Sequence, residues 1–269
     1  MVWVFFGLSA ALSWTVWLWP ISHRAVFFIA YEGWRITWPT DNMKLVIGNA
    51  LPGLLALVWV SVQGKERLHD LLSSVFAWRT SPIWYLLSIA LPSIVLVISA
   101  CAVLILFSQS PGRPSMLVLV NSLLTLPTGP LCEEIAWRGF ALRKLRLHYS
   151  PLLSALIIGV YWAVWHIPVW LLTLKYLTIT LLLVICINLV AWSVVFAFLY
   201  ERSGESLPVV ILLHATYQAV QAQVAVVVTR GTVSIILIAA ALSVFLAVIL
   251  GRRLERQPPA IIDSNAQPS

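Results

Sequence analysis

Two neighbouring glutamates, Glu133 and Glu134, lie in an apolar stretch of a chain that has only 10 acidic residues in 269. An ionisable side chain within a membrane segment costs at least about 2.5 kcal/mol, so its presence indicates a function. Arg138 follows Glu134 by four residues, which places the two on one helix face and predicts an ion pair. Glu133 lies about 100° further round the helix and is therefore predicted to remain free for chemistry.

Two histidines lie in later apolar segments, each with a neighbour at helical spacing. His166 follows Trp162 by four residues and His214 precedes Gln218 by four, so each pair shares a helix face. Together with Glu133 they supply a general base, its orienting partner and donors for an oxyanion. Each feature alone also has a structural explanation: a histidine packed in a core, an indole that only fills space, or a structural ion pair.

The composition indicates an all-α, polytopic membrane protein, because 61% of the residues are hydrophobic, 10% are charged and the mean hydropathy is +0.94. We expect about eight transmembrane helices surrounding a conical catalytic cavity. The apolar segments, each near the ~20 residues that cross a bilayer, are residues 2–19, 44–63, 84–107, 116–135, 152–173, 177–199, 207–228 and 232–251.

Residues 1–254 are predicted to form a single transmembrane domain, followed by a polar, disordered tail at 255–269. The first segment lacks a basic flank and a small-residue cleavage site, so it is predicted to be a retained span. Residues 64–82 have amphipathic spacing that suits a helix lying on the membrane surface.

The formal net charge of +7 is attributed to basic loops that face a cytoplasm and anionic lipid, and binding of nucleic acid is not expected. If both termini are cytoplasmic, that side carries ten Lys and Arg residues: Lys65, Arg67, Arg79, Arg143, Lys144, Arg146, Arg202, Arg252, Arg253 and Arg256. The opposite side carries six: Arg24, Arg35, Lys44, Arg113, Lys175 and Arg230. This bias predicts a multi-pass protein of the cell membrane with both termini inside.

Three motifs in order resemble those of the CAAX prenyl endopeptidase and bacteriocin-processing (CPBP, or Abi) family of intramembrane proteases, to which the Ras-converting endopeptidase of eukaryotes belongs. They are Glu133-Glu134-x-x-x-Arg138, Trp162-x-x-x-His166 and His214-x-x-x-Gln218. The resemblance spans about residues 116–225, the catalytic core, whereas the first hundred residues match only in being apolar.

The resemblance implies that Glu133, with His166, activates a water molecule and that His214 and Gln218 stabilise the tetrahedral oxyanion. Glu134 and Arg138 would support this geometry. The chain departs from the family pattern in two places. Gln218 stands where Asn or Asp is usual, which keeps the amide but carries it one methylene further, and Trp162 stands where Phe is common.

The predicted substrate is a membrane-embedded or lipidated peptide, reached through a cavity open to cytoplasm and lipid, and a membrane protein partner is not identified. No cofactor is expected, although one Glu and two His could hold Zn²⁺, so a zinc metalloprotease is an alternative. The three cysteines, Cys101, Cys132 and Cys186, have no metal-site spacing. The sequence also allows a non-catalytic scaffold or immunity factor that binds a partner protein, and a transporter or proton relay, the latter without an inverted repeat.

The predicted spans leave a mismatch in depth. At 1.5 Å per residue, His214 would lie about 10 Å and His166 about 21 Å from the cytoplasmic end of their spans, whereas Glu133 would lie near that end.

Overall fold

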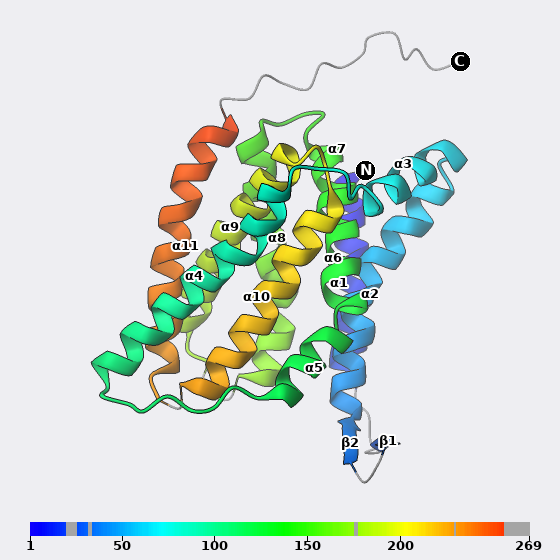
Figure 1. Cartoon of the computed structure of the whole chain (residues 1–269). Coiled ribbons are helices and arrows are strands. Elements are labelled where there is room, and N and C mark those ends of the chain that lie inside the picture. The colour runs from blue at the N-terminus through cyan, green and yellow to red at the C-terminus, as the bar shows by residue number, and fades with distance from the viewer. Residues whose placement is uncertain (20–25, 32–33, 175–176, 229, 256–269) are drawn as a thin grey trace.

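The computed structural model describes residues 1–19, 26–31, 34–174, 177–228 and 230–255. Figure 1 shows a bundle of long helices joined by short connections. The main elements are α1 (Val2–Leu18), β1 (Val26–Tyr31), β2 (Trp34–Pro39), α2 (Thr40–Ser61), α3 (Lys65–Val75), α4 (Pro82–Leu106), α5 (Met116–Leu124), α6 (Cys132–Glu134), α7 (Arg143–Leu145), α8 (Pro151–Thr173), α9 (Ile179–Arg202), α10 (Leu207–Val227) and α11 (Thr232–Glu255).

The helical membrane architecture is confirmed. Seven helical stretches of the described residues are long and apolar enough to cross a membrane, and α1 is a shorter apolar helix. The seven stretches and α1 together correspond one to one with the eight predicted segments. The residues between α1 and α2 include one element of another kind, the antiparallel pair β1–β2 in the register Val26↔Pro39 to Tyr31↔Trp34.

Both ends of the described chain lie at the same end of the bundle, as Figure 1 shows, in agreement with an even number of crossings. The same end carries α3, which is the helix that the amphipathic spacing predicts, and only Leu71 and Ser74 of α3 are buried. The pair β1–β2 lies at the opposite end. The predicted tail begins at Glu255, which is still part of α11, and residues 256–269 lie outside the described residues.

The helix that carries the glutamates departs from regular α geometry. Two π-helical turns, Pro127–Leu131 and Ile135–Leu142, flank α6. Pro130 has no N–H to donate to the carbonyl of Leu126. The N–H of Leu131 donates to that carbonyl instead, with 3.0 Å between nitrogen and oxygen. The proline therefore explains the wider turn that precedes Glu133, and such turns are frequent at functional sites.

The predicted end of this fourth span at residue 135 is wrong, because the helical stretch runs from Met116 to Leu145. Trp137, Phe140 and Leu142 are buried after the charged motif. Glu133 therefore lies twelve residues before the helix end, about 18 Å at the α-helical rise. That depth falls between those of His214 and His166, so Glu133 no longer lies outside the range of depths of the two histidines.

Close helix packing holds the motif in place. A Cβ added to Gly53 of α2 would lie 2.6 Å from the Cα of Cys132, so only glycine allows α2 to approach α6 this closely. On the other side, the Ser193 hydroxyl of α9 donates a hydrogen bond of 2.8 Å to the Ala155 carbonyl of α8. Small residues at helix contacts are the usual means by which membrane helices associate.

Candidate active site

The predicted ion pair between Glu134 and Arg138 is present, and both side chains are buried. Arg138 Nη1 lies 3.1 Å from Glu134 Oε1 and 3.0 Å from Oε2, and the two side chains are at most 1% exposed. The guanidinium also packs over the ring of Phe196, with 4.2 Å between Cζ and the ring centroid. A buried charge needs a partner and further contacts of this kind to be tolerated.

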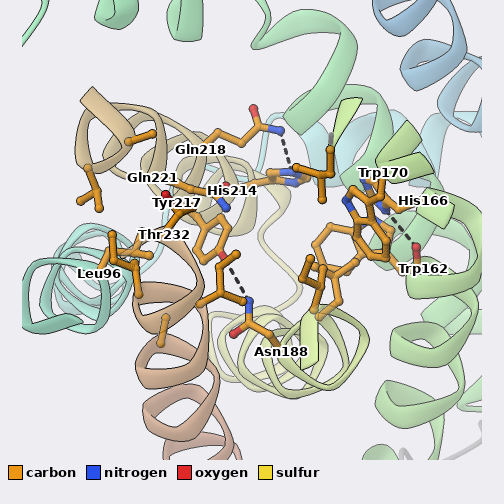
Figure 2. A pocket seen from close by; sticks show the side chains of 18 residues that line it. Leu96, Trp162, His166, Trp170, Asn188, His214, Tyr217, Gln218, Gln221 and Thr232 are labelled. Atoms are coloured by element: carbon orange, nitrogen blue, oxygen red, sulfur yellow. Dashed lines mark hydrogen bonds between the residues drawn. The ribbon is translucent and has the colours of Figure 1, made fainter. Parts of the chain in front are cut away.

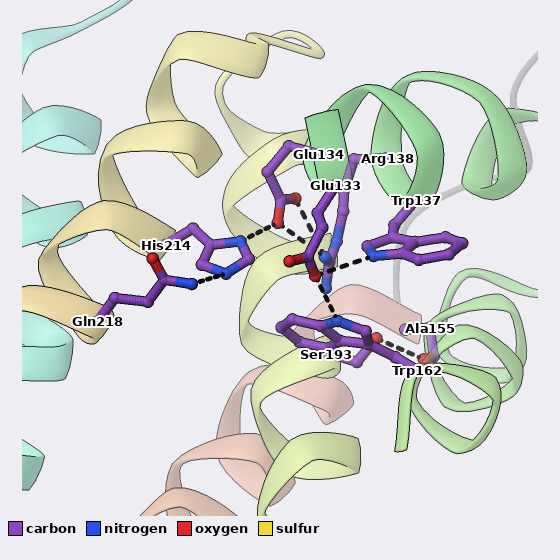
Figure 3. A network of polar contacts seen from close by, with 9 residues as sticks. All are labelled: Glu133, Glu134, Trp137, Arg138, Ala155, Trp162, Ser193, His214 and Gln218. Carbon is purple, nitrogen blue, oxygen red and sulfur yellow. Dashed lines mark hydrogen bonds and ion pairs between the residues drawn. The ribbon is translucent and has the colours of Figure 1, made fainter. Parts of the chain in front are cut away.

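Glu134 has a second partner that the sequence did not predict. His214 Nδ1 lies 2.7 Å from Glu134 Oε1, so the carboxylate joins α6 to α10 (Figure 3). The sequence associated His214 with Glu133, but among the described residues neither His214 nor His166 forms a hydrogen bond or ion pair with Glu133. Glu134 therefore orients the His214 ring, a role beyond pairing with Arg138.

Glu133 is 1% exposed and is held by two indoles. Trp162 Nε1 donates to Glu133 Oε2 at 2.8 Å, and Trp137 Nε1 donates to the same oxygen at 3.4 Å (Figure 3). Sequence reasoning placed Trp162 as packing and missed Trp137. The available signal was that an indole N–H buried in a membrane span needs an acceptor. Among the described residues Oε1 of Glu133 has no hydrogen bond, so this oxygen remains for a water molecule or substrate.

The indole of Trp162 also contacts the rings of both histidines. Its ring centroid lies 5.8 Å from that of His166 and 5.6 Å from that of His214. His166 Nδ1 lies 2.9 Å from the Trp162 carbonyl, and the His166 ring stacks on Trp170 at 5.4 Å. The structure thus brings the histidines and Glu133 around one indole, although they come from three separate helices.

Gln218 lies beside His214, as the i,i+4 spacing predicts. Gln218 Nε2 is 3.2 Å from His214 Nε2, on the ring edge opposite Glu134 (Figure 3). With Nδ1–H of His214 donated to the carboxylate, the neutral ring accepts a hydrogen bond at Nε2, and the imidazolium form donates there instead. The two nitrogens are close enough for one oxygen placed beside both to contact each of them.

A cavity of about 320 Å³ adjoins these groups (Figure 2). Its wall includes Trp162, His166, His214 and Gln218, and the rest is mainly apolar side chains of α4, α8, α9, α10 and α11. None of its lining residues is Lys, Arg, Asp or Glu. The cavity is therefore suited to apolar peptide segments.

The cavity extends toward the end of the bundle that lies opposite the termini. It reaches Leu174, which follows the last residue of α8, and Thr232, the first residue of α11. Thr232 begins α11, whose other end, Glu255, lies near the C-terminus. The predicted opening of the cavity to cytoplasm and lipid stays a prediction. Which face is cytoplasmic stays a prediction.

Polar side chains on α9, α10 and α11 fix the outer cavity wall. Asn188 Nδ2 donates to the Tyr217 hydroxyl at 3.0 Å, and the Ser243 hydroxyl lies 2.7 Å from Asn188 Oδ1. This network links three helices across the membrane interior, where such bonds strengthen helix association.

Among the described residues no three His, Cys, Asp or Glu side chains are grouped so that they could hold a metal ion. The facing atoms of Glu134 and His214 are joined to each other. The cysteines Cys101, Cys132 and Cys186 are free thiols. Hydrolysis without a resident metal stays the prediction for this site.

Two comparisons with known proteins bear on the site. Residues 114–220 match the family model described as type II CAAX prenyl endopeptidase Rce1-like, and this range contains every predicted site residue. The chain is also 25% identical over 155 residues to CAAX prenyl protease 2 of Methanococcus maripaludis. That alignment covers 53% of this chain and 57% of the relative, so the chain spans a little over half the length of the relative it matches.

Proposed function

We propose that this protein is an intramembrane endopeptidase of glutamate type. Through residues 114–220 it belongs to the Rce1-like CAAX prenyl endopeptidase family. Its substrate is a membrane-associated peptide, lipidated or membrane-inserted, cut near its C-terminus. The observation that carries the proposal is a buried carboxylate, Glu133, with one oxygen held by indoles and the other free, next to a cavity lined by two histidines.

In the proposed reaction Glu133 accepts a proton from a water molecule that His166 helps to position. The water oxygen bonds to the carbonyl carbon of the scissile peptide bond, and the carbonyl oxygen becomes an oxyanion. When the C–N bond breaks, Glu133 returns the proton to the leaving amine. General acid–base catalysis of this kind contributes about 100- to 10,000-fold.

The oxyanion is proposed to lie beside both His214 Nε2 and the Gln218 amide. Glu134, at 2.7 Å from Nδ1, orients the His214 ring so that Nε2 faces the position of the oxyanion. Arg138 holds the Glu134 side chain in place through their ion pair. Donors placed in advance where water is excluded are effective because they need no reorganisation during the reaction.

Replacing Gln218 by Leu is expected to lower kcat about 100-fold, since one oxyanion donor is lost. Gln218→Asn, which restores the amide on a shorter side chain, should recover part of that loss. The matched control is Gln221→Leu, on the same cavity wall, which should change KM rather than kcat. Equal kcat for Gln218→Leu and the unaltered protein would show that the amide does not contact the oxyanion.

The proposal is tested with the purified protein in liposomes and two peptides that share one sequence, a farnesylated CAAX peptide and its unprenylated form. Mass spectrometry is expected to show loss of the three C-terminal residues after the modified cysteine. Pre-incubation with a zinc chelator should leave the rate unchanged if hydrolysis needs no metal. Intact peptides after incubation with correctly folded protein would favour a non-catalytic scaffold instead.

A further inference from the structure

A second cavity, of about 260 Å³, lies on the other side of Gln218 from the substrate cavity. It is lined by Leu45, Val46 and Asn49 of α2, by Asn121, Thr125, Thr128 and Gly129 around the end of α5, and by Gln218. We call it the amide pocket. Gln218 lines both cavities and is therefore the partition between them. A polar cavity of this size has room for several water molecules.

The amide pocket approaches the free oxygen of Glu133 through Gly129. A Cβ built on Gly129 would lie 3.4 Å from Gln218 Nε2 and 3.9 Å from Glu133 Oε1. The oxygen that Trp162 and Trp137 leave free thus lies next to Gly129 and on the pocket side of the carboxylate. The indoles approach the other oxygen, so the two oxygens of Glu133 have different surroundings.

The amides of the pocket differ from the other amides of the membrane interior. Asn188 and Gln223 bond to neighbouring helices, as polar residues in membrane spans usually do. The side-chain amides of half-buried Asn49 and exposed Asn121 have no hydrogen bond among the described residues. A polar group inside a membrane is costly without a partner, so the half-buried amide of Asn49 needs water. Asn49 and Asn121 both line the amide pocket.

We propose that the amide pocket holds the water that the peptidase consumes and passes it, past Gly129 and Gln218, to Glu133 Oε1. This inference rests on the proposed function. Each turnover uses one water molecule, whose hydroxyl goes to the new carboxyl end and whose proton goes to the new amine. A peptide that fills the substrate cavity blocks that route to Glu133, and a separate polar pocket keeps the base supplied.

The first test replaces three polar side chains of the pocket by apolar ones of similar size. Thr125 and Thr128 each bond back to their own helix, so Thr125→Val with Thr128→Val, combined with Asn49→Leu, should fold normally. We expect kcat to fall about tenfold with KM for the peptide unchanged. Thr173→Val is the matched control, because Thr173 also bonds back to its own helix and lies at the far end of α8, and its kcat should not change. An unchanged kcat in the triple variant overturns the inference.

The second test does not depend on activity. X-ray radiolytic labelling, in which bound water is converted to hydroxyl radicals, should modify Leu45 and Val46 in the unaltered protein and in Glu133→Gln. The triple variant should lose this labelling. Unlabelled Leu45 and Val46 overturn the inference whether or not the protein cleaves peptides. Labelled side chains in a protein that cleaves no peptide overturn the proposed function, and the supply role with it.

Discussion

Glu133→Gln is expected to abolish peptide cleavage, with kcat lowered by about 1,000-fold or more. The amide has the volume of the carboxylate and its oxygen still accepts hydrogen bonds from Trp162 and Trp137, so the helix packing has no reason to change. It cannot accept the proton of an attacking water. Cleavage of the CAAX peptide in liposomes, followed by mass spectrometry, measures the effect, and the thermal unfolding midpoint of the variant in detergent checks the fold.

The matched control is Glu66→Gln on the exposed face of α3, which should leave kcat unchanged. Cleavage retained by Glu133→Gln would remove Glu133 from the mechanism and leave His166 or His214 as the base to consider. A cellular phenotype that survives Glu133→Gln while cleavage is lost would identify a scaffold role that does not use the carboxylate.

Arg138→Met is expected to lower the free energy of unfolding by about 3–5 kcal/mol, because it leaves the fully buried carboxylate of Glu134 without its cation. The double variant Glu134→Gln with Arg138→Met should recover most of that loss, since no unpaired charge remains. Unfolding in detergent micelles, followed by circular dichroism, compares the two variants in the manner of a double-mutant cycle.

Arg253→Met at the exposed end of α11 is the control, and it should change stability little. The two Arg138 variants also separate stability from catalysis. The double variant should be stable but poorly active, because an amide at position 134 holds the His214 ring through a weaker hydrogen bond than a carboxylate does. Full activity in the double variant would show that His214 works without a charged partner at Nδ1.

Local spacing was enough to predict much of this protein. The apolar segments match the membrane-spanning helices because hydrophobic length is a property of the chain itself. The Glu134–Arg138 and His214–Gln218 pairs formed as predicted because residues four apart on a helix are neighbours whatever surrounds the helix. The family resemblance followed from the same ordered motifs and is supported by the match over residues 114–220.

Partners on different helices could not be predicted in this way, because they depend on how each helix is rotated and how deep it lies. Glu134, not Glu133, contacts His214, and the indoles of Trp162 and Trp137 hold Glu133. The span that carries the glutamates continues past its charges, since burial of Arg138 against Glu134 makes them tolerable inside the bundle.

The sequence alone thus determined which residues are present at membrane depth and which of them share a helix face. Only the tertiary structure decided which face meets which, that the substrate cavity extends away from the termini, and that a second polar cavity adjoins Gln218. The physical reason is that periodicity is set along one helix, whereas rotation, depth and cavities are set by the packing of all the helices together.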